Sequence, residues 1–293
     1  MDSLRAPLAF LRTLAMAGAM AAPALATPAQ AEAPQDSVTK SFVDADGTTI
    51  RRYGNSERLG KLVDQAHLGT GQDDARVINQ EHGYAVMAGK DHPTDHLTVP
   101  TKPISGIESP ELTSPGAENY FADAWKDGRQ KTAESLGTTP DQLPRDAIAL
   151  AVNSQGGRSQ DRLHIHADRL DPKLGAELKE QLEHGGVVAD QWTNLKPIHD
   201  GHQYRALWVE GSDLTQNPFQ LVHDQLAVEY GEEYARTHMG QHTLAVVGET
   251  DAHGKPGFII LDGRYGSDPG LPTGPHHSAS AEEWLLGHGN TQR

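Results

Sequence analysis

The segment from Ile148 to Leu170 constrains the fold more than any other part of the chain. Apolar and small residues alternate up to Val152, which predicts a half-buried β-strand. The sequence Gln-Gly-Gly-Arg at residues 155–158 has the composition of a turn. A second predicted strand follows, in which Leu163, Ile165 and Ala167 alternate with polar residues, namely Arg162, His164, His166 and Asp168.

Successive side chains of a strand point to opposite faces of its sheet. The alternation therefore predicts that two imidazoles, one guanidinium and one carboxylate share one face. Three interpretations remain open from the spacing alone: a solvent-exposed strand face, a catalytic histidine pair, or a metal site. A His-x-His pair on a strand can bind zinc, but it needs a third ligand from elsewhere in the chain.

Four separate stretches, in order along the chain, carry a resemblance to a known family. They are PTKPISGIESPELT at residues 100–113, NSQGGRSQDRLHIH at 153–166, GHQYRALWV at 201–209 and SASAEEW at 278–284. They resemble the histidine-triad (HIT) superfamily and, within it, the CDP-diacylglycerol pyrophosphatase family, from about Leu59 to about Trp284. The resemblance implies an α+β fold: a HIT-like domain at residues 56–293, with an antiparallel sheet, flanking helices and N- and C-terminal elaborations.

The resemblance also implies an activity, which is hydrolysis of the pyrophosphate bond of CDP-diacylglycerol to CMP and phosphatidate. In HIT enzymes a histidine forms a nucleotidyl intermediate that water resolves, and no metal or other cofactor is expected here. Three alternatives are a HIT-like hydrolase of another nucleoside diphosphate-linked substrate, a non-catalytic nucleotide- or lipid-binding module, and a metal-dependent hydrolase.

Two alignments of the histidine triad fit the residues. In the first, Arg162, His164 and His166 occupy the three positions, and His164 is the nucleophile. In the second, His164, His166 and Asp168 occupy them, and His166 is the nucleophile. The resemblance implies that both histidines contact the phosphates in either alignment. We favour the first alignment, and either one leaves the proton donor for the leaving group unassigned.

Further substrate-binding residues follow from position and from the resemblance. Asn153 matches the HIT asparagine that orients the intermediate, and it also suits a turn. The other candidates are hydrogen-bond donors, cations or pocket residues: Ser159, Gln160, Arg158, Lys102, His202 and Tyr204. Loops around Ile104–Ile107 and Trp192–Leu195 are candidate walls of a lipid groove beside the histidine strand.

The charge of the chain narrows the choice of partner. It carries 25 Lys and Arg against 40 Asp and Glu, a net charge of −15. Binding to a nucleic-acid backbone relies on basic residues that neutralise phosphates, so nucleic acid is not expected as a partner. The chain has no cysteine, which excludes disulfides, thiolate metal sites and a cysteine nucleophile.

The N-terminal residues predict export from the cytoplasm. Residues 1–31 have a basic start, an Ala/Leu/Met-rich stretch and a small-x-small sequence at 29–31, as in a secretory signal peptide. Periplasmic or secreted localisation is expected, with transient contact with a membrane surface for the lipid substrate. The alternative is an uncleaved N-terminal anchor in the inner membrane.

Residues 32–55 are expected to be flexible or irregular, with one turn between strands at residues 44–47. Apolar spacing and turn residues predict the remaining elements. The expected helices are residues 56–68, 119–136, 172–184 and 217–234. Further strands are expected at residues 84–87, 96–100, 201–209, 238–247 and 256–261.

Overall fold

A computed structural model of the 293-residue chain describes residues 38–47, 49–53, 55–68, 75–89, 93–198, 201–264 and Leu286. The predicted signal peptide, residues 32–37 and the SASAEEW stretch lie outside the described residues. The described residues belong to one compact unit, which spans residues 36–293.

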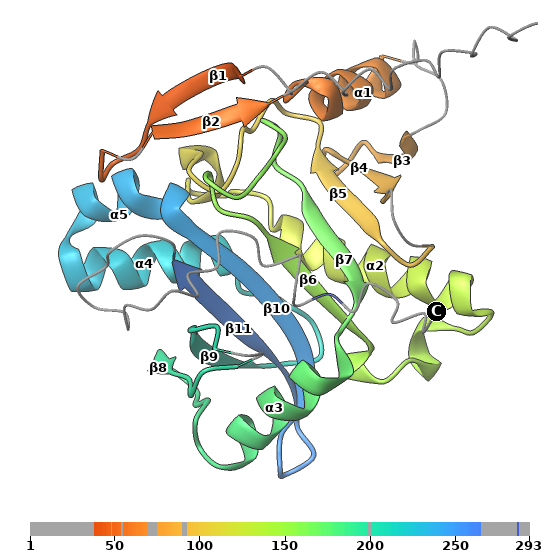
Figure 1. Cartoon of the computed structure of the whole chain (residues 1–293). Helices are drawn as coiled ribbons and strands as arrows, with labels where there is room; N and C mark the ends of the chain where they lie inside the picture. Colours follow the sequence, from red (N-terminus) through yellow and green to blue (C-terminus); the bar gives the residue numbers. More distant parts are fainter. Residues whose placement is uncertain are drawn as a thin grey trace, which may run out of the picture. The chain divides into compact units, whose positions relative to one another are not determined.

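A nine-stranded antiparallel sheet organises this unit, in the order β3-β4-β5-β7-β6-β10-β11-β9-β8 (Figure 1). Its strands are β3 (Ala75–Asn79), β4 (Tyr84–Ala88), β5 (His96–Pro100), β6 (Ile148–Val152), β7 (Ile165–Arg169), β8 (Thr193–Asn194), β9 (Arg205–Glu210), β10 (His242–Thr250) and β11 (Pro256–Arg264). The structure therefore confirms an α+β fold with a large antiparallel sheet.

Within the described ranges, five α-helices accompany the sheet: α1 (Arg58–His67), α2 (Tyr120–Leu136), α3 (Pro172–Glu183), α4 (Pro218–Tyr230) and α5 (Glu232–His238). The starts of three of them follow from local sequence. The side chains of Asn119, Asp171 and Asn217 each accept a backbone hydrogen bond at the N-terminus of α2, α3 and α4, as N-cap residues do.

The two faces of the sheet are covered differently. One face, here called the α2 face, carries a single apolar cluster that includes Leu150, Ile165 and Ala167 and extends to α2 and α4. The opposite face, here called the histidine face, carries two clusters. One lies under α1 and includes Val99, and the other lies under α3 and includes Ala151.

The sheet consists of two parts that are each local in sequence. Strands β3 to β7 come from residues 75–169, and strands β8 to β11 come from residues 193–264. Among the described strands, the pairing of β6 with β10 joins these two parts of the sheet, in a ladder of four residue pairs that includes Val152 with Leu244. The β6–β10 pairing therefore closes a loop of about 90 residues. On its other side, β6 pairs with β7.

Two expectations from the sequence need correction. Residues 38–53 are not irregular, because β1 (Val38–Val43) and β2 (Thr49–Tyr53) form an antiparallel hairpin around the expected turn. Arg264 donates to Asp46 of this hairpin at 3.1 Å, which ties it to β11. The helix expected at residues 217–234 is two helices, since Gly231 between α4 and α5 has φ = 93°, outside the helical region. The remaining expected helices and strands form, with boundaries shifted by a few residues.

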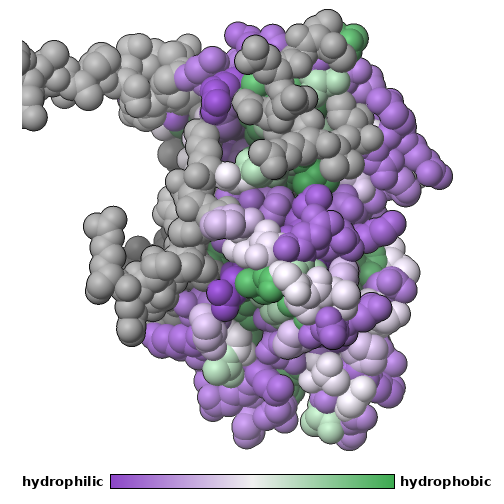
Figure 2. Space-filling model, turned by 90° about the vertical axis from the view of Figure 1, so that its right-hand side faces the viewer, coloured by the Kyte–Doolittle hydropathy of each residue, from purple (hydrophilic) through white to green (hydrophobic). Residues whose placement is uncertain are grey.

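The surface of the described residues is mainly polar where it can be seen. Figure 2 shows one face of the molecule, on which hydrophilic residues dominate and hydrophobic ones form only small separate areas. None of the helices in the described ranges combines the length and apolar character needed to cross a bilayer.

Candidate active site

The two histidines of the sequence motif lie side by side at the start of β7. Their ring centroids are 5.1 Å apart, and the rings are inclined at 64°. His164 is only 9% exposed, while the side chain of His166 is 15% exposed. Their neighbours Ile165 and Ala167 point into the α2-face cluster, so the alternation places His166 on the histidine face, as predicted.

Small side chains lie beside His166 on this face. His166 pairs with Ala151 of β6, and Ala151 pairs in turn with Ala245 of β10. Asn153 directly follows β6 and is 5% exposed, which places it at the same end of the sheet as His164. The structure therefore brings Asn153 and both histidines to the same end of two adjacent strands.

A backbone carbonyl holds His164 in one orientation. Its Nδ1 atom lies 2.7 Å from the carbonyl oxygen of Arg162. A carbonyl can only accept, so this contact places a proton on Nδ1 and leaves the lone pair of a neutral ring on Nε2. In a neutral His164 ring, Nε2 is therefore the nitrogen that can act as a nucleophile or a base.

His166 has a different neighbour, which the sequence did not identify. Its Nδ1 atom lies 3.7 Å from Oδ1 of Asp95, a residue that is 7% exposed. This separation is an ion-pair distance rather than a hydrogen bond. Asp95 precedes a predicted strand, and no local pattern distinguishes it from other turn carboxylates.

Asp168, the third residue of the second triad alignment, is fully buried. Its Oδ1 atom accepts hydrogen bonds from the Thr94 hydroxyl at 2.6 Å and from the backbone amide of Arg169 at 2.7 Å. The Asp168 carboxylate is therefore hydrogen-bonded within the protein, both to the loop that precedes β5 and to the C-terminal end of β7.

Arg162, the first residue of the other alignment, is also engaged by the protein. Its Nη1 atom donates to the carbonyls of Pro100, Thr101 and Lys102 at 2.9–3.2 Å, and its Nη2 atom donates to Asp64 at 2.7 Å. The guanidinium joins the end of β5 to α1. It lies ahead of β7, which begins at Ile165, so strand alternation does not fix its direction.

Arg158 is buried in an ion-paired cluster. Its guanidinium donates two hydrogen bonds to Glu108, at 2.5 and 2.6 Å, and a longer one to Asp161 at 3.4 Å. Gly106 leaves the room for this cluster, because a Cβ atom there would lie 2.1 Å from Nη1 of Arg158. The positive charge predicted for phosphate binding is thus neutralised within the protein.

The three other polar candidates near the loop differ in their contacts. Gln160 accepts from the backbone amide of Leu59 at 2.9 Å and donates to the carbonyl of Asn55, so it fixes the start of α1. Ser159 and Lys102 are exposed. Among the described residues, the Lys102 side chain forms no ion pair or hydrogen bond, which leaves its charge available to a ligand.

Tyr204 and His202 come from the other part of the sheet. Tyr204 is 2% exposed and belongs to the cluster under α3. Its ring packs on Gly263, where a Cβ atom would lie 2.6 Å from Cε1. His202 is half-buried and forms an isolated bridge with Ile198. Neither residue lies on a strand adjacent to β7.

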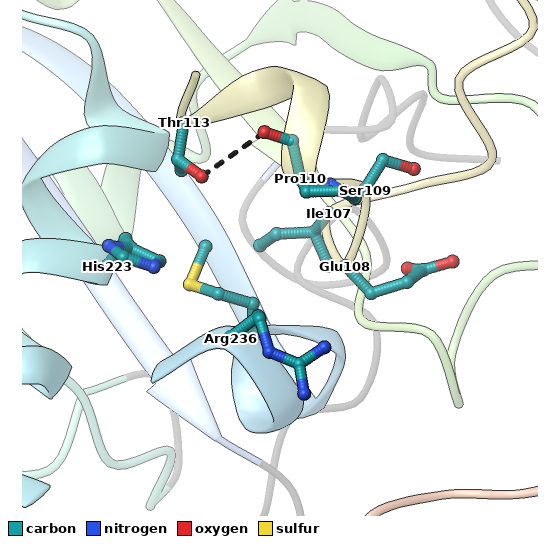
Figure 3. Close-up of a pocket in the computed structure, with 8 residues that line it drawn as sticks. Ile107, Glu108, Ser109, Pro110, Thr113, His223 and Arg236 are labelled. Carbon is teal, nitrogen blue, oxygen red and sulfur yellow. Dashed lines mark hydrogen bonds between the residues drawn. The ribbon is translucent and has the colours of Figure 1, made fainter. Parts of the chain in front are cut away.

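The loop after β5 does not form the expected groove wall. Ile104 and Ile107 are 4% and 1% exposed and pack into the α2-face cluster, on the side of the sheet opposite His166. Ile107 lines a separate cavity of about 110 Å³ between this loop, His223 of α4 and Arg236 of α5 (Figure 3). The loop reaches the β6–β7 connection through the pairing of Glu108 with Arg158.

Two adjacent imidazoles at the end of an antiparallel sheet, one held through Nδ1 by a backbone carbonyl, define a candidate site for histidine-based hydrolysis. The comparisons with known proteins agree with this class. The chain belongs to the CDP-diacylglycerol pyrophosphatase family, whose model matches residues 60–283.

A curated CDP-diacylglycerol pyrophosphatase from Yersinia pestis is 37% identical over 202 residues. This match covers 67% of the present chain and 73% of the Yersinia pestis protein. The matched range of the family model includes both histidines, Asn153 and Asp95.

Proposed function

We propose that this chain hydrolyses the pyrophosphate bond of CDP-diacylglycerol to CMP and phosphatidate through a covalent intermediate on His164. Family membership supports the substrate and the reaction. The observation that supports the nucleophile is the 2.7 Å contact between Nδ1 of His164 and the carbonyl of Arg162.

The choice between the two histidines rests on their Nδ1 contacts. A nucleophilic imidazole needs an acceptor at one nitrogen so that the other carries the lone pair. His164 has a carbonyl at 2.7 Å, whereas His166 faces Asp95 at 3.7 Å. This difference favours the alignment in which His164 is the middle histidine and His166 contacts the phosphate as a cation.

The reaction then has two displacements at the same phosphorus. Nε2 of His164 attacks the phosphorus of the CMP moiety, and the bond to the phosphatidate oxygen breaks with its electron pair on phosphatidate. Water attacks the resulting phosphoramidate, the P–N bond breaks with its electron pair on Nε2, and the water proton passes to solvent. The carbonyl of Arg162 stabilises the ring while it is positively charged.

Charge neutralisation on the phosphates needs cations near the histidine pair. The guanidinium groups of Arg158 and Arg162 are directed to protein acceptors, so we assign this role to the exposed Lys102 and to His166 beside His164, with Asn153 and Ser159 as hydrogen-bonding groups. Phosphatidate is a good leaving group, which reduces the need for a proton donor. The broken triad is therefore compatible with turnover.

The proposal extends to the fold and to localisation. An asparagine at the end of β6, a Gly-rich connection and two histidines at the start of the antiparallel β7 support a HIT-like assignment of the sheet. The composition of residues 1–31 supports export to the periplasm or secretion, with transient contact with a membrane surface to reach the lipid.

The test is CMP release from CDP-diacylglycerol in detergent micelles containing EDTA. We expect His164→Ala to lower kcat/KM by about 10⁴-fold or more, as loss of a nucleophile does. Mass spectrometry of rapidly quenched enzyme should detect a CMP adduct on His164 in the wild type or in His166→Ala. An adduct on His166 would instead support the second alignment, and no CMP release from the wild type would refute the proposed reaction.

His96→Ala is the matched control. His96 lies on the neighbouring strand β5, and its Nδ1 atom contacts the carbonyl of Thr94, two residues earlier, at 2.8 Å. It thus has the same local contact as His164. It pairs with Ala167, however, and so points to the α2 face. We expect this variant to retain wild-type activity.

A further inference from the structure

We propose that His82, Glu118 and Asp123 form a site for one divalent transition-metal ion such as Zn²⁺, separate from the histidine pair of β7. One ligand atom of each side chain lies within 4.8 Å of those of the other two. His82 belongs to the turn between β3 and β4, Glu118 precedes α2, and Asp123 lies in the first turn of α2.

The separations suit a metal centre. Nδ1 of His82 lies 2.8 Å from Oε1 of Glu118 and 3.8 Å from Oδ1 of Asp123. Zn²⁺ binds nitrogen and carboxylate oxygen at about 2.0–2.2 Å, so neighbouring ligand atoms in a tetrahedral site lie about 3–4 Å apart. Small side-chain rotations complete the geometry, because Glu118 and His82 are 33% and 42% exposed.

A second observation concerns the buried carboxylate of Asp123, which lacks a hydrogen bond at one of its oxygens in the described residues. The residue is 9% exposed, and its Oδ2 atom is buried without a hydrogen-bond partner in the described part of the chain. Oδ1 of Asp123 lies at an ion-pair distance of 3.8 Å from Nδ1 of His82, so a proton on His82 compensates Oδ1 and leaves Oδ2 without a hydrogen bond in the described residues.

The charge around the cluster favours a cation. Two carboxylates carry two negative charges, and a metal ion would replace the proton that Nδ1 of His82 shares with Glu118. Asp127 lies one helical turn further along α2. Asp127 accepts a hydrogen bond from the Tyr84 hydroxyl at 2.6 Å, which leaves that carboxylate directed to Tyr84 rather than to the ion.

The imidazole selects the class of ion. Imidazole with carboxylates suits Zn²⁺, Ni²⁺, Cu²⁺ or Fe²⁺, whereas Mg²⁺ and Ca²⁺ prefer oxygen ligands alone. Three protein ligands leave a fourth position for water. The ion would join the β3–β4 turn to the start of α2, on the face of the sheet opposite His166. Its role is to stabilise this corner of the domain, and it takes no part in the proposed hydrolysis.

The test is calorimetric titration of the metal-free full chain with Zn²⁺. We expect His82→Ala and Asp123→Asn each to remove one Zn²⁺ equivalent or to weaken it by at least about 10–100-fold. Zn²⁺ should raise the Tm of the wild type more than that of either variant. His184→Ala is the control, since this exposed histidine contacts only the carbonyl of Glu180 in the described residues.

Other histidines can also bind Zn²⁺, so the result is the difference between variants. Identical titrations of the wild type, His82→Ala and Asp123→Asn would overturn the proposal. Glu118→Gln provides a further variant with little risk to folding, because Glu118 is partly exposed and outside the core clusters. Loss of the same equivalent in this variant would support the site.

Discussion

The two faces of the sheet differ in how completely they are covered. On the α2 face one apolar cluster extends from Tyr84 of β4 to Ile260 of β11 without interruption. On the histidine face the apolar covering is divided into a cluster under α1 and a cluster under α3. His166 and Asp168 stand on β7, at the interruption between them. The apolar covering is therefore continuous on the α2 face. The candidate catalytic histidine His166 lies where the covering of the histidine face is interrupted.

The largest effect that sharpens this comparison is expected from His166→Ala. The change removes a cation from the phosphates and should lower kcat/KM for CMP release by about 10²–10⁴-fold. The free energy of unfolding should change by less than about 1 kcal/mol, since the side chain belongs to no apolar cluster. Steady-state kinetics and urea unfolding measure the two quantities. A large loss of stability would contradict the division between the faces.

The converse change lies on the α2 face. Leu150 is fully buried in the cluster of that face, on the strand next to β7. Leu150→Ala should lower the free energy of unfolding by about 2–5 kcal/mol through lost burial and a residual cavity. The folded fraction should keep its kcat/KM, measured well below the Tm. A loss of activity in fully folded protein would break the comparison.

Arg162→Lys tests whether the guanidinium of Arg162 stabilises the fold or binds the substrate. A lysine keeps the charge but cannot reproduce four directed hydrogen bonds to three carbonyls and Asp64. We expect a loss of about 2 kcal/mol in unfolding free energy and a KM within about twofold of the wild type. A raised KM with unchanged stability would instead indicate that Arg162 contacts phosphate.

The smallest effect concerns Glu249 of β10, which is 4% exposed. Burial raises its pKa above the ordinary value of 4.5, so the folded state retains the proton to higher pH than the unfolded state. The contribution of Glu249 to stability is therefore present below pH 4.5 and is lost as pH rises through the folded pKa. The Tm of Glu249→Gln relative to the wild type should increase from pH 4 to pH 7. A constant difference across this range would refute the shift.

Much of the fold could be predicted because its signals are local. Alternation at residues 148–152 and 162–168 predicted both strands and the faces of Ile165 and His166. Apolar spacing and composition predicted α2, α3 and α4, which begin within about a residue of the expected positions. The turn of the β1–β2 hairpin was expected, but residues 38–53 were otherwise expected to be irregular, because anchors such as the contact of Asp46 with Arg264 are remote in sequence.

The site was predicted only in part for the same physical reason. Arg158, Gln160 and Arg162 follow Asn153 closely and were interpreted as substrate ligands. Their protein partners are Glu108, Leu59 and Asp64, which lie 50 to 101 residues away. No local sequence pattern indicates that such remote partners will be brought near, and none indicates that Asp95 approaches His166. Their contribution to substrate binding remains a prediction.

The single ladder between β6 and β10 has a consequence for how the enzyme matures during synthesis. Strands β3 to β7 pair among themselves, so they can assemble while the remainder is still being translated. The pairs of β6 with Ala245 and its neighbours form only after a further stretch of about 90 residues has left the ribosome. The histidine strand β7 therefore has both of its pairing partners, β5 and β6, within residues 75–169, whereas the second partner of β6 is supplied only by β10.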